Sequence, residues 1–492
     1  MSNINLSKSK YCRAKQCDKI LWLDKNKPDV AVQTTSDSIF KTGIKVGELA
    51  KKYFGEFINI EYNHGDLSRM IVETEAYLQN VPNVITEASF NYKNNFCSVD
   101  ILKNDIDGLE IYEVKSTTEV KDINLDDVAY QVYVLNGLGY KIKSVNIMFL
   151  NDKYLRQGKL DLNQLFNIQD VTNVAFSKQE EIQRKILEIN EYMQCQEEPN
   201  RKIGMQCFKP YPCAYWNYCT RNLPKKNVFS ISGMMTKKKL ELYNKGIFRY
   251  EDLINENINE NYKQEVEVEL TDEIIIKKDE IREFVKTLYY PLYFLDFETF
   301  QHAIPEYDGT RPYQQIPFQY SLHYIERENG ELKHTEFLAE VGKDPRRSLA
   351  ENLVRDIPTN VCVTAYNMSF EKRVIEELAE QFEDLRDNLL KIHNNIKDLM
   401  IPFQKRWYYI KEMEGSYSIK FVLPALYPNN PECDYNNLLI VHNGEEASNI
   451  YESLQDRNKE EQDKIRKALL EYCKLDTLAM VKVWEKLKEK GE

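Results

Sequence analysis

The sequence is poor in histidine and tryptophan and has no long apolar run. Its six histidines show no spacing typical of metal ligands. No apolar stretch approaches the roughly 18 residues that a membrane span needs. The N-terminus has no apolar segment followed by a small-residue cleavage site, which a secretory signal would require. These absences predict a soluble, cytoplasmic protein that does not engage a membrane.

Basic charge is also in deficit. The 66 lysines and arginines are outnumbered by 78 aspartates and glutamates, and the net charge is −12. The chain therefore lacks the basic footprint that is usual in nucleic-acid-binding proteins. This deficit of basic charge does not exclude a nucleic-acid partner, because enzymes that cut phosphodiester bonds with metal ions gather carboxylates in their sites. Binding would then rest on a local basic track and weaken steeply with salt.

Strand-like and helix-like runs divide the chain into three parts. Residues 1–222 hold several strand-like runs between helical segments, and residues 289–492 run through strands to a closing helix. Both patterns predict α/β domains. Residues 223–288 are rich in lysine, then in acids and asparagine. They predict a short helical connector, either helix–hairpin–helix-like or a solvated linker.

Two carboxylates and a lysine occur together in the first part. Glu113 and Lys115 are two residues apart in a strand-like run, so they face the same side, while Val114 points into the core. We expect Asp100, on the adjacent strand, to lie close to Glu113, and Glu87 precedes this strand pair. Two carboxylates suit a divalent cation, most often Mg²⁺. A lysine beside them can orient or deprotonate water. A surface Glu-x-Lys strand without function has the same spacing.

A second set of acids lies in the third part. Asp296 and Glu298 are two residues apart on the apolar strand YFLDFET, and acids among buried neighbours need a partner such as a metal ion. Glu371 stands where a strand enters a helix. Tyr472 and Asp476 are four residues apart and stack on one face of the closing helix. An edge strand with protruding acids is the structural alternative.

The cysteines are unevenly distributed. Ten cysteines without an export signal do not indicate disulfides. Cys207, Cys213 and Cys219 form an even C-x5-C-x5-C run with prolines and aromatics between them. This run favours ligands of a metal group over core packing. The segment SKSKYCRAKQCDK near the N-terminus is basic, and it either follows a phosphate backbone or is a solvated face.

The surroundings of the first carboxylate pair resemble the PD-(D/E)XK nuclease superfamily, particularly its RecB-like branch. The helix TGIKVGELA upstream and Gln131 downstream carry this resemblance. It implies metal ligands at Asp100 and Glu113, a catalytic lysine at Lys115 and an active-site glutamine at Gln131. Many RecB-like nucleases have a histidine on the upstream helix. The matching residue is Glu48, which can also serve and leaves the metal preference open.

The same resemblance extends to the cysteines. Some RecB-like nucleases hold a 4Fe-4S cluster with one cysteine before the nuclease core and three after it. Cys17 would be the first ligand here, with Cys12 as a rival, and Cys207, Cys213 and Cys219 would be the others. The implied cluster joins both ends of the domain. Zinc and plain thiols stay as alternatives, because four thiolates suit zinc as well and the spacing departs from that of the family.

The second set of acids is similar to the DEDD exonuclease superfamily of the ribonuclease H-like fold, tyrosine subclass. The resemblance implies that two metal ions, Mg²⁺ or Mn²⁺, are held by a set of four acids: Asp296, Glu298, Glu371 and Asp476. Tyr472 would position the attacking water. Glu371 departs from the family, which usually has aspartate there.

Over nearly its full length the chain resembles a bacterial family of uncharacterised fusion proteins. The segments LSKSKYCRAKQCDKILWL, TGIKVGELA, LEIYEVKSTTEVKD and YFLDFETF carry this resemblance. It implies a PD-(D/E)XK nuclease domain with a 4Fe-4S clasp at 1–222, the connector at 223–288, and a DEDD exonuclease domain at 289–492.

The implied function is a metal-dependent nuclease with two active sites. Its substrate would be DNA, as single strands or ends, in repair, processing or defence. One alternative is an RNA exonuclease that works from 3′ to 5′. Another is a nucleic-acid-binding scaffold with one inactive nuclease domain, for which Glu371 points to the C-terminal domain.

Overall fold

The chain forms a mixed α/β structure of two compact units. The structure, a computed structural model, describes residues 6–32, 37–63, 65–428, 430–431 and 435–492. Unit 1 comprises residues 1–222 and 302–314, and unit 2 comprises residues 223–301 and 315–492. The α/β architecture predicted from the sequence is confirmed.

Unit 1 is built on a seven-stranded sheet with the strand order β2-β3-β4-β5-β6-β7, and β1 pairs with β4. Neighbouring strands are antiparallel from β3 to β5 and at β6–β7, and parallel at β1–β4, β2–β3 and β5–β6. Its strands are β1 (Leu6–Ser7), β2 (Ile58–Asn59), β3 (Asn83–Tyr92), β4 (Asn95–Asp105), β5 (Gly108–Lys115), β6 (Ile142–Leu150) and β7 (Phe166–Asp170). Its helices are α1 (Lys8–Gln16), α2 (Asp18–Asn26), α3 (Asp37–Lys52), α4 (Leu67–Tyr77), α5 (Asp122–Gly137), α6 (Leu162–Leu165), α7 (Thr172–Ser177), α8 (Gln179–Tyr192) and α9 (Trp216–Cys219).

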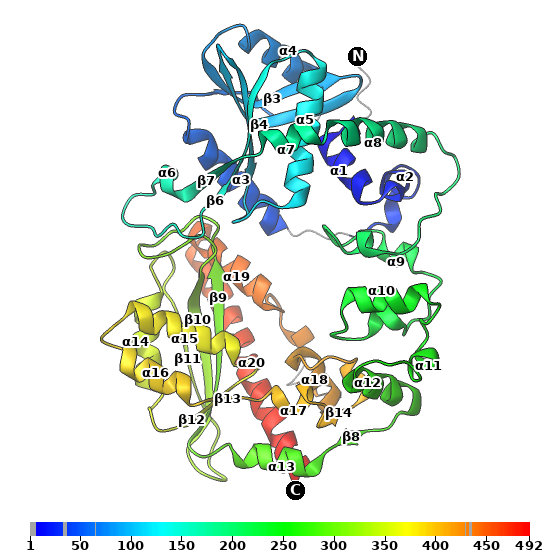
Figure 1. The fold of residues 1–492 in the computed structure, drawn as a ribbon. Coiled ribbons are helices and arrows are strands. Elements are labelled where there is room, and N and C mark those ends of the chain that lie inside the picture. The colour runs from blue at the N-terminus through cyan, green and yellow to red at the C-terminus, as the bar shows by residue number, and fades with distance from the viewer. Residues whose placement is uncertain (1–5, 33–36, 64, 429, 432–434) are drawn as a thin grey trace. The chain divides into compact units, whose positions relative to one another are not determined.

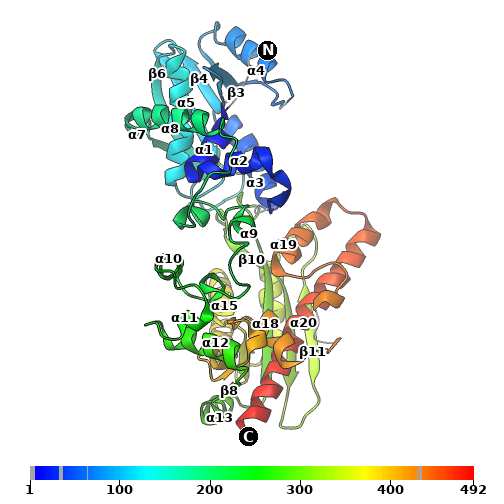
Figure 2. The ribbon, with the colours of Figure 1, turned by 90° about the vertical axis from the view of Figure 1, so that its right-hand side faces the viewer.

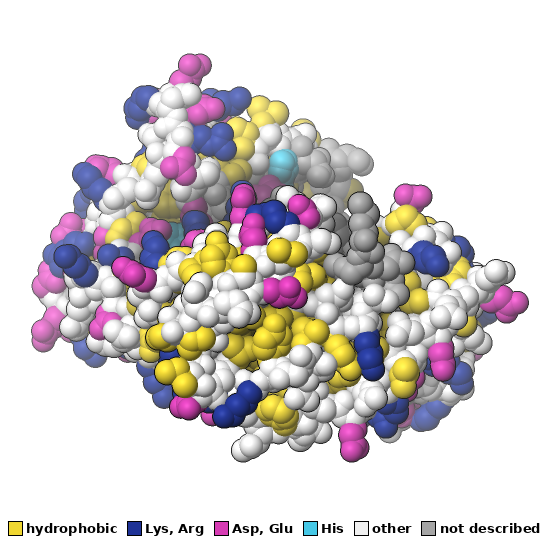
Figure 3. Space-filling model, turned by 90° about the horizontal axis from the view of Figure 1, so that it is seen from above, with side chains coloured by type: hydrophobic (Ala, Val, Ile, Leu, Met, Phe, Trp, Pro, Cys, Tyr) yellow, Lys and Arg dark blue, Asp and Glu magenta, His cyan; other side chains and the backbone are white. Residues whose placement is uncertain are grey.

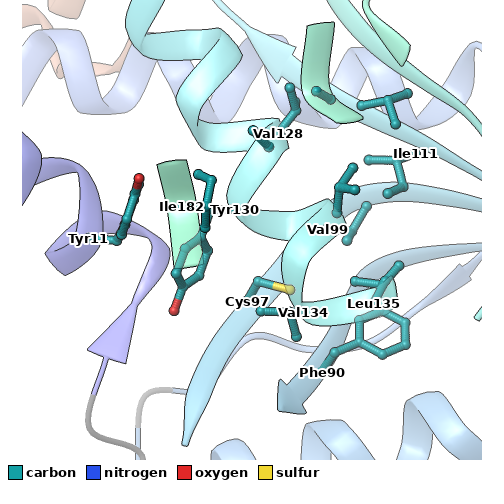
Figure 4. Close-up of a cluster of buried hydrophobic side chains, with 14 of the residues drawn as sticks. Tyr11, Phe90, Cys97, Val99, Ile111, Val128, Tyr130, Val134, Leu135 and Ile182 are labelled. Atoms are coloured by element: carbon teal, nitrogen blue, oxygen red, sulfur yellow. The ribbon is translucent and has the colours of Figure 1, made fainter. Parts of the chain in front are cut away.

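The core of unit 1 joins the sheet to α5 and to the N-terminal segment. Helix α5 packs on β3, β4 and β6 (Figure 1). Most of its buried side chains are apolar, and Gln131 is a buried polar one that contacts β4 and β5. Tyr11 of α1 and Tyr130 of α5 are fully buried, and their rings stack with centroids 4.9 Å apart (Figure 4). Burying two such rings contributes several kcal/mol, on the order of 2 kcal/mol each. The N-terminal segment is therefore an integral part of unit 1.

Unit 2 contains a five-stranded sheet with the order β11-β10-β9-β12-β13, and a two-stranded sheet of β14 and β8. The first three strands are antiparallel, whereas β12 and β13 run parallel to β9. The strands are β8 (Ile275–Ile276), β9 (Leu292–Gln301), β10 (Gln315–Ile325), β11 (Lys333–Leu338), β12 (Cys362–Ala365), β13 (Ile396–Asp398) and β14 (Tyr408–Tyr409). The helices are α10 (Thr236–Asn244), α11 (Tyr250–Leu253), α12 (Glu260–Thr271), α13 (Lys278–Lys286), α14 (Arg346–Asp356), α15 (Ser369–Gln381), α16 (Arg386–Asn394), α17 (Ile401–Gln404), α18 (Ile419–Leu426), α19 (Gly444–Glu452) and α20 (Lys459–Gly491).

Both faces of the five-stranded sheet are covered. Successive residues of β9 alternate, so Leu295 and Phe297 pack with α14, α15 and α16, and Phe294 packs with α20. Figures 1 and 2 both show the long α20 beside β9 and β10. Acids on β9 therefore lie inside a two-sided core and close to α20.

The segment expected to connect two domains is helical and belongs to unit 2. Arg406 donates from Nη2 to Glu265 Oε2 of α12 at 3.1 Å, and its guanidinium lies 3.9 Å from the ring centroid of Tyr409. Both charged side chains are at most 5% exposed. A buried pair of this kind fixes α12 against the rest of unit 2, because removing either partner would leave a buried charge.

A seam of polar side chains joins β10 to α20. His323 Nδ1 lies 2.7 Å from Thr477 Oγ1, and Ser321 Oγ lies 2.8 Å from the same hydroxyl. His334 of β11 pairs with His323 across the strands and contacts Ser321 Oγ through Nε2 at 3.0 Å. Because hydrogen bonds have defined directions, this seam sets the rotation of α20 against the sheet.

Helices that combine the length and apolar character of a membrane span do not occur in the described part of the chain. On the face seen in Figure 3, basic and acidic side chains are interspersed among apolar ones, without a broad field of one sign. The acidic excess of the chain is thus not gathered into one broad patch on this face.

The histidine seam predicts a loss of stability in acid. Burial lowers the pKa of His323 from 6.5 to about 3, helped by His334 and Lys474, and burial lowers that of His334 to about 4. As the pH falls from 6.5 towards 4, the two histidines bind protons in the unfolded chain but not in the folded chain. The free energy of unfolding therefore decreases. His323→Gln should make this decrease smaller by about 1 kcal/mol.

Urea unfolding of the full chain at neutral pH and near pH 5 measures this effect. His393→Gln, at a half-buried histidine on α16 outside the seam, is the matched control. The same pH dependence in His323→Gln and in the unmodified protein would contradict the prediction.

Candidate metal and cluster sites

The first candidate site lies on β4 and β5 of unit 1, beside α5. Ile101 pairs with Tyr112 in antiparallel register, which brings Asp100 and Glu113 to neighbouring positions. Glu113 is 2% exposed and Asp100 is half-buried. Asp100 Oδ2 accepts a hydrogen bond from the backbone amide of Val114 at 2.7 Å, which fixes the carboxylate beside β5.

The Glu113 carboxylate is bound at both oxygens. Oε1 accepts from Lys115 Nζ at 2.8 Å and from Lys8 Nζ at 2.6 Å. Oε2 accepts from Gln131 Nε2 at 2.6 Å. Gln131 is fully buried on α5 and also donates to the carbonyl of Ser98. The structure thus joins three of the predicted residues, Glu113, Lys115 and Gln131, in direct contact.

Charges alternate in this site. Burial raises the pKa of Asp100, and the charge of Glu113 raises it further. Burial acts the same way on Glu113, but the ammonium groups of Lys115 and Lys8 outweigh it and lower the pKa of Glu113. Lys115 Nζ also donates to Asp127 Oδ2 at 2.6 Å. Burial opposes the charge on Lys115, yet Glu113 and Asp127 hold its pKa well above its ordinary value.

Glu87 is a further carboxylate near this pair. Ser98 donates to Glu87 Oε2 at 3.1 Å, and burial, together with the charge of Glu113, raises the pKa of Glu87. The Glu48 side chain on α3 is 59% exposed and pairs with Lys51 at 2.7 Å. The charge of Lys51 also lowers the pKa of Glu87, so this lysine acts on both glutamates.

The four candidate cluster cysteines gather at one end of unit 1. Cys17 lies between α1 and α2, and it packs with Cys213 and Cys219 around Trp22. The backbone amide of Cys213 donates to the carbonyl of Cys207 at 3.0 Å. Burial raises the pKa of all four thiols, that of Cys207 to about 11. Cys219 raises the pKa of the other three, so the four sulfurs share one environment.

The chemistry of these four residues suits a metal group. Four thiolates can bind an iron–sulfur cluster or a zinc ion. Cys12 is directed elsewhere, because its thiol donates to Asp127 Oδ1 at 3.0 Å.

The second candidate site lies in unit 2, where β9, α15 and α20 meet. Asp296 is half-buried, and the other three predicted acids are at most 8% exposed: Glu298, Glu371 and Asp476. The ligand atoms of Asp296, Glu298 and Cys473 all lie within 4.8 Å of one another. β9 and α20 thus meet at Asp296, Glu298 and Cys473, and the charges of Glu371 and Asp476 act on Glu298.

The four acids of unit 2 destabilise one another's charged forms. Burial raises the pKa of each one. The charge of Asp476 raises that of Asp296, and Asp296 in turn raises those of Glu298 and Glu371. Lys420 lowers the pKa of Asp296, Glu298 and Asp476, which offsets part of this repulsion.

Glu371 carries an unmatched acceptor. It is 2% exposed, and its Oε2 has no hydrogen-bond partner among the described residues. Buried polar atoms nearly always have a partner, so such an atom calls for an explanation. Oxygen ligands of this kind are those that Mg²⁺ and Mn²⁺ prefer. The residues present therefore fit a divalent cation.

Tyr472 and Tyr435 flank the Asp476 carboxylate. Tyr435 donates to Asp476 Oδ1 at 2.6 Å, and Lys420 Nζ lies 3.4 Å from the Tyr472 hydroxyl. Hydrogen bonds from both tyrosines partly oppose the rise in the pKa of Asp476 that burial causes. Cys473 directs its thiol at Asp296 Oδ2 at 3.7 Å. The predicted stacking of Tyr472 and Asp476 on one helix face thus places both at the cluster.

Asp398 orients the entry to α15. Its carboxylate accepts backbone hydrogen bonds from Asn367 at 3.0 Å, Met368 at 3.2 Å and Met400 at 2.9 Å. Asn367 has a positive φ of 72°, which asparagine tolerates better than most residues. This turn directs the first helical turn, and with it Glu371, toward β9.

Sequence reasoning missed several residues of these sites. Lys8, Asp127, Lys420 and Asp398 contact candidate residues across long sequence separations. A signal existed for Lys8, because it belongs to the basic segment before Cys12. Asp398 ends a strand, which is where polar residues of α/β sheets gather.

Two comparisons with known proteins found similarities to this chain. A family model described as a domain of unknown function, DUF2779, matches residues 293–418, which contain Asp296, Glu298 and Glu371. Over 121 residues the chain is 31% identical to the CRISPR-associated exonuclease Cas4 of Methanocaldococcus jannaschii. The match covers 25% of this chain and 60% of that protein, so the chain spans less than two thirds of this relative. The similarity is to a nuclease.

Glu371 Oε2, which has no hydrogen-bond partner among the described residues, predicts that the melting temperature of the protein depends on metal. Glu371→Gln removes a repelled charge, so without metal its melting temperature should rise by about 2–4 °C per kcal/mol gained. Added Mg²⁺ or Mn²⁺ should raise the melting temperature of the unmodified protein and raise that of the variant much less. Thermal unfolding with and without metal measures both effects.

Glu376→Gln is the matched control, because Glu376 is exposed on the same helix. It should keep the metal response of the unmodified protein. An equal response to metal in Glu371→Gln would show that this carboxylate does not hold the ion.

Proposed function

We propose that the chain is a metal-dependent nuclease that hydrolyses phosphodiester bonds of DNA at two separate sites. The observation that carries the proposal is the convergence of buried, mutually repelling carboxylates in unit 2. Such a cluster is unstable alone and becomes stable with divalent cations. The similarity to an exonuclease and the contacts among Glu113, Lys115 and Gln131 support the same chemistry in unit 1.

In unit 1, we assign Asp100 and Glu113 as ligands of Mg²⁺ or Mn²⁺. The ion would supply an activated water and charge stabilisation at the phosphate. Gln131 holds Glu113 Oε2 and so orients the carboxylate. Lys115 is held between Glu113 and Asp127. An ammonium held in this way orients water and offsets the charge of the scissile phosphate.

In unit 2, we assign Asp296, Glu298, Glu371 and Asp476 as ligands of two cations. Paired ions of this kind stabilise both the attacking and the leaving oxygen. Tyr472 stands beside Asp476 with its hydroxyl near Lys420, where it can position water by hydrogen bonding. Asp398 and the seam on α20 keep Glu371 and Asp476 in place.

We propose that Cys17, Cys207, Cys213 and Cys219 hold a 4Fe-4S cluster with a structural role. A group bound by all four would join the N-terminal segment to residues 207–219, some 190 residues further along the chain. Such cross-links stabilise mainly by limiting the unfolded chain.

Cleavage of end-labelled DNA tests the two sites. Anaerobically purified protein with Mg²⁺ or Mn²⁺ should degrade single-stranded DNA. Lys115→Ala and Asp296→Ala should each remove one product pattern with a loss of roughly 100-fold or more, and the double variant should remove both. Lys143→Ala on β6 and Glu376→Gln on α15 are surface controls that should cleave normally.

Matched RNA oligonucleotides complete the assay. Cleavage of RNA with sparing of DNA would replace the proposal by an RNA exonuclease. Intact DNA and RNA with either metal would replace it by a binding scaffold.

The cluster is tested by metal content and visible absorbance. Anaerobic protein should contain iron and acid-labile sulfide, and Cys17→Ser, Cys213→Ser or Cys219→Ser should lose both along with thermal stability of unit 1. Cys12→Ser and Cys195→Ser are controls that should keep the cluster, because the Cys12 thiol donates to Asp127 and the Cys195 thiol donates to the carbonyl of Glu191. Stoichiometric zinc without iron would contradict the assignment.

A further inference from the structure

Lys8 is held in the first candidate site by the fold of the N-terminal segment. Leu6 pairs with Asn95 as β1 adds to β4, and the buried Leu6 carbonyl accepts from Tyr130 at 3.1 Å. Ser7 then caps α1 by accepting from the backbone amide of Lys10. The start of α1 is thus held by the β1–β4 pairing and by the Ser7 cap, which place its first residue, Lys8, beside Glu113.

The Lys8 ammonium uses an acceptor position that a metal ion needs. A carboxylate oxygen has about two acceptor positions. Lys8 and Lys115 take both positions of Glu113 Oε1, at 2.6 and 2.8 Å, and Gln131 binds Oε2. A cation that coordinates Oε1 must therefore displace one of the two ammonium groups.

Lys8 is the more weakly held of the two. Lys115 has a second carboxylate partner, Asp127, at 2.6 Å. Among the described residues Lys8 donates to Glu113 alone, while Asp100 and Asp127 attract its charge without a hydrogen bond. The two lysines are about equally exposed, at 22% for Lys8 and 21% for Lys115, so the hydrogen bonds distinguish them. A long, flexible side chain with one hydrogen-bonded partner is released at lower cost than one hydrogen-bonded to two carboxylates.

We propose that Lys8 is a placeholder for the divalent cation: its ammonium neutralises Glu113 in the metal-free site and leaves when the metal binds. The inference rests on the proposed metal site of unit 1. Its consequence is a competition, so Lys8 sets the metal concentration at which this site fills. It also offsets part of the repulsion between Asp100 and Glu113 before the metal arrives.

Binding of Mn²⁺ to the full-length protein tests the competition without using cleavage. The measurement uses an Asp296→Asn, Glu298→Gln background, which removes binding in unit 2, and follows free Mn²⁺ by electron paramagnetic resonance. Lys8→Met should bind Mn²⁺ roughly tenfold more tightly, because one of the two ammonium groups on Glu113 Oε1 is removed. Lys8→Arg keeps a cation and should stay near the unmodified affinity.

Lys10→Met is the matched control, since Lys10 is exposed on the same helix. Without metal, Lys8→Met should also melt at a lower temperature, and Mn²⁺ should restore it more than it stabilises the background protein. Equal Mn²⁺ affinity in Lys8→Met and in the background protein would overturn the inference alone. Absence of binding in both would overturn it together with the metal site of unit 1.

Discussion

Repulsion between buried carboxylates is the constraint around which both candidate sites are built. Ionised acids in a low-dielectric interior require cations, and the two units meet this requirement differently. Unit 1 carries its own cations, because Lys8 and Lys115 neutralise Glu113. Unit 2 leaves Glu371 with an unmatched oxygen, and Lys420 offsets only part of the charge around it. Without metal, the charge of Glu113 in unit 1 is therefore compensated by lysines, whereas part of the carboxylate charge in unit 2 is not.

The scaffolds reflect this difference. In unit 1, strand register alone places Asp100 beside Glu113, and α5 adds Gln131 from above the sheet. In unit 2 the acids come from β9, α15 and α20, and contacts between these elements must oppose the repulsion of the acids. The seam between His323 and Thr477 ties α20 to the sheet, and Asp398 ties the turn before α15. These polar contacts lie one layer outside the carboxylates and hold them against their mutual repulsion.

Short-range periodicity accounts for what the sequence could predict. The spacing of two residues put Glu113 with Lys115 and Asp296 with Glu298, and the spacing of four put Tyr472 with Asp476. The same patterns predicted an α/β chain. Contacts of Lys8 with Glu113 and of Asp398 with the turn at Asn367 depend on tertiary pairing, which no local pattern encodes. The ion pair of Glu48 with Lys51 was likewise not predicted from the sequence.

Unit 1 is built from residues that lie far apart in the sequence, and this separation affects how the unit forms during synthesis. Cys17 shares its environment with Cys219, and the unit also includes residues 302–314. At about 5–20 residues per second, a ribosome needs roughly 10–40 seconds to travel from the first of these cysteines to the last. During that time the early thiols are exposed and the N-terminal segment has only part of its partners. Assembly of any group on the four cysteines must therefore wait for Cys219, when more than half of the chain is still to be made.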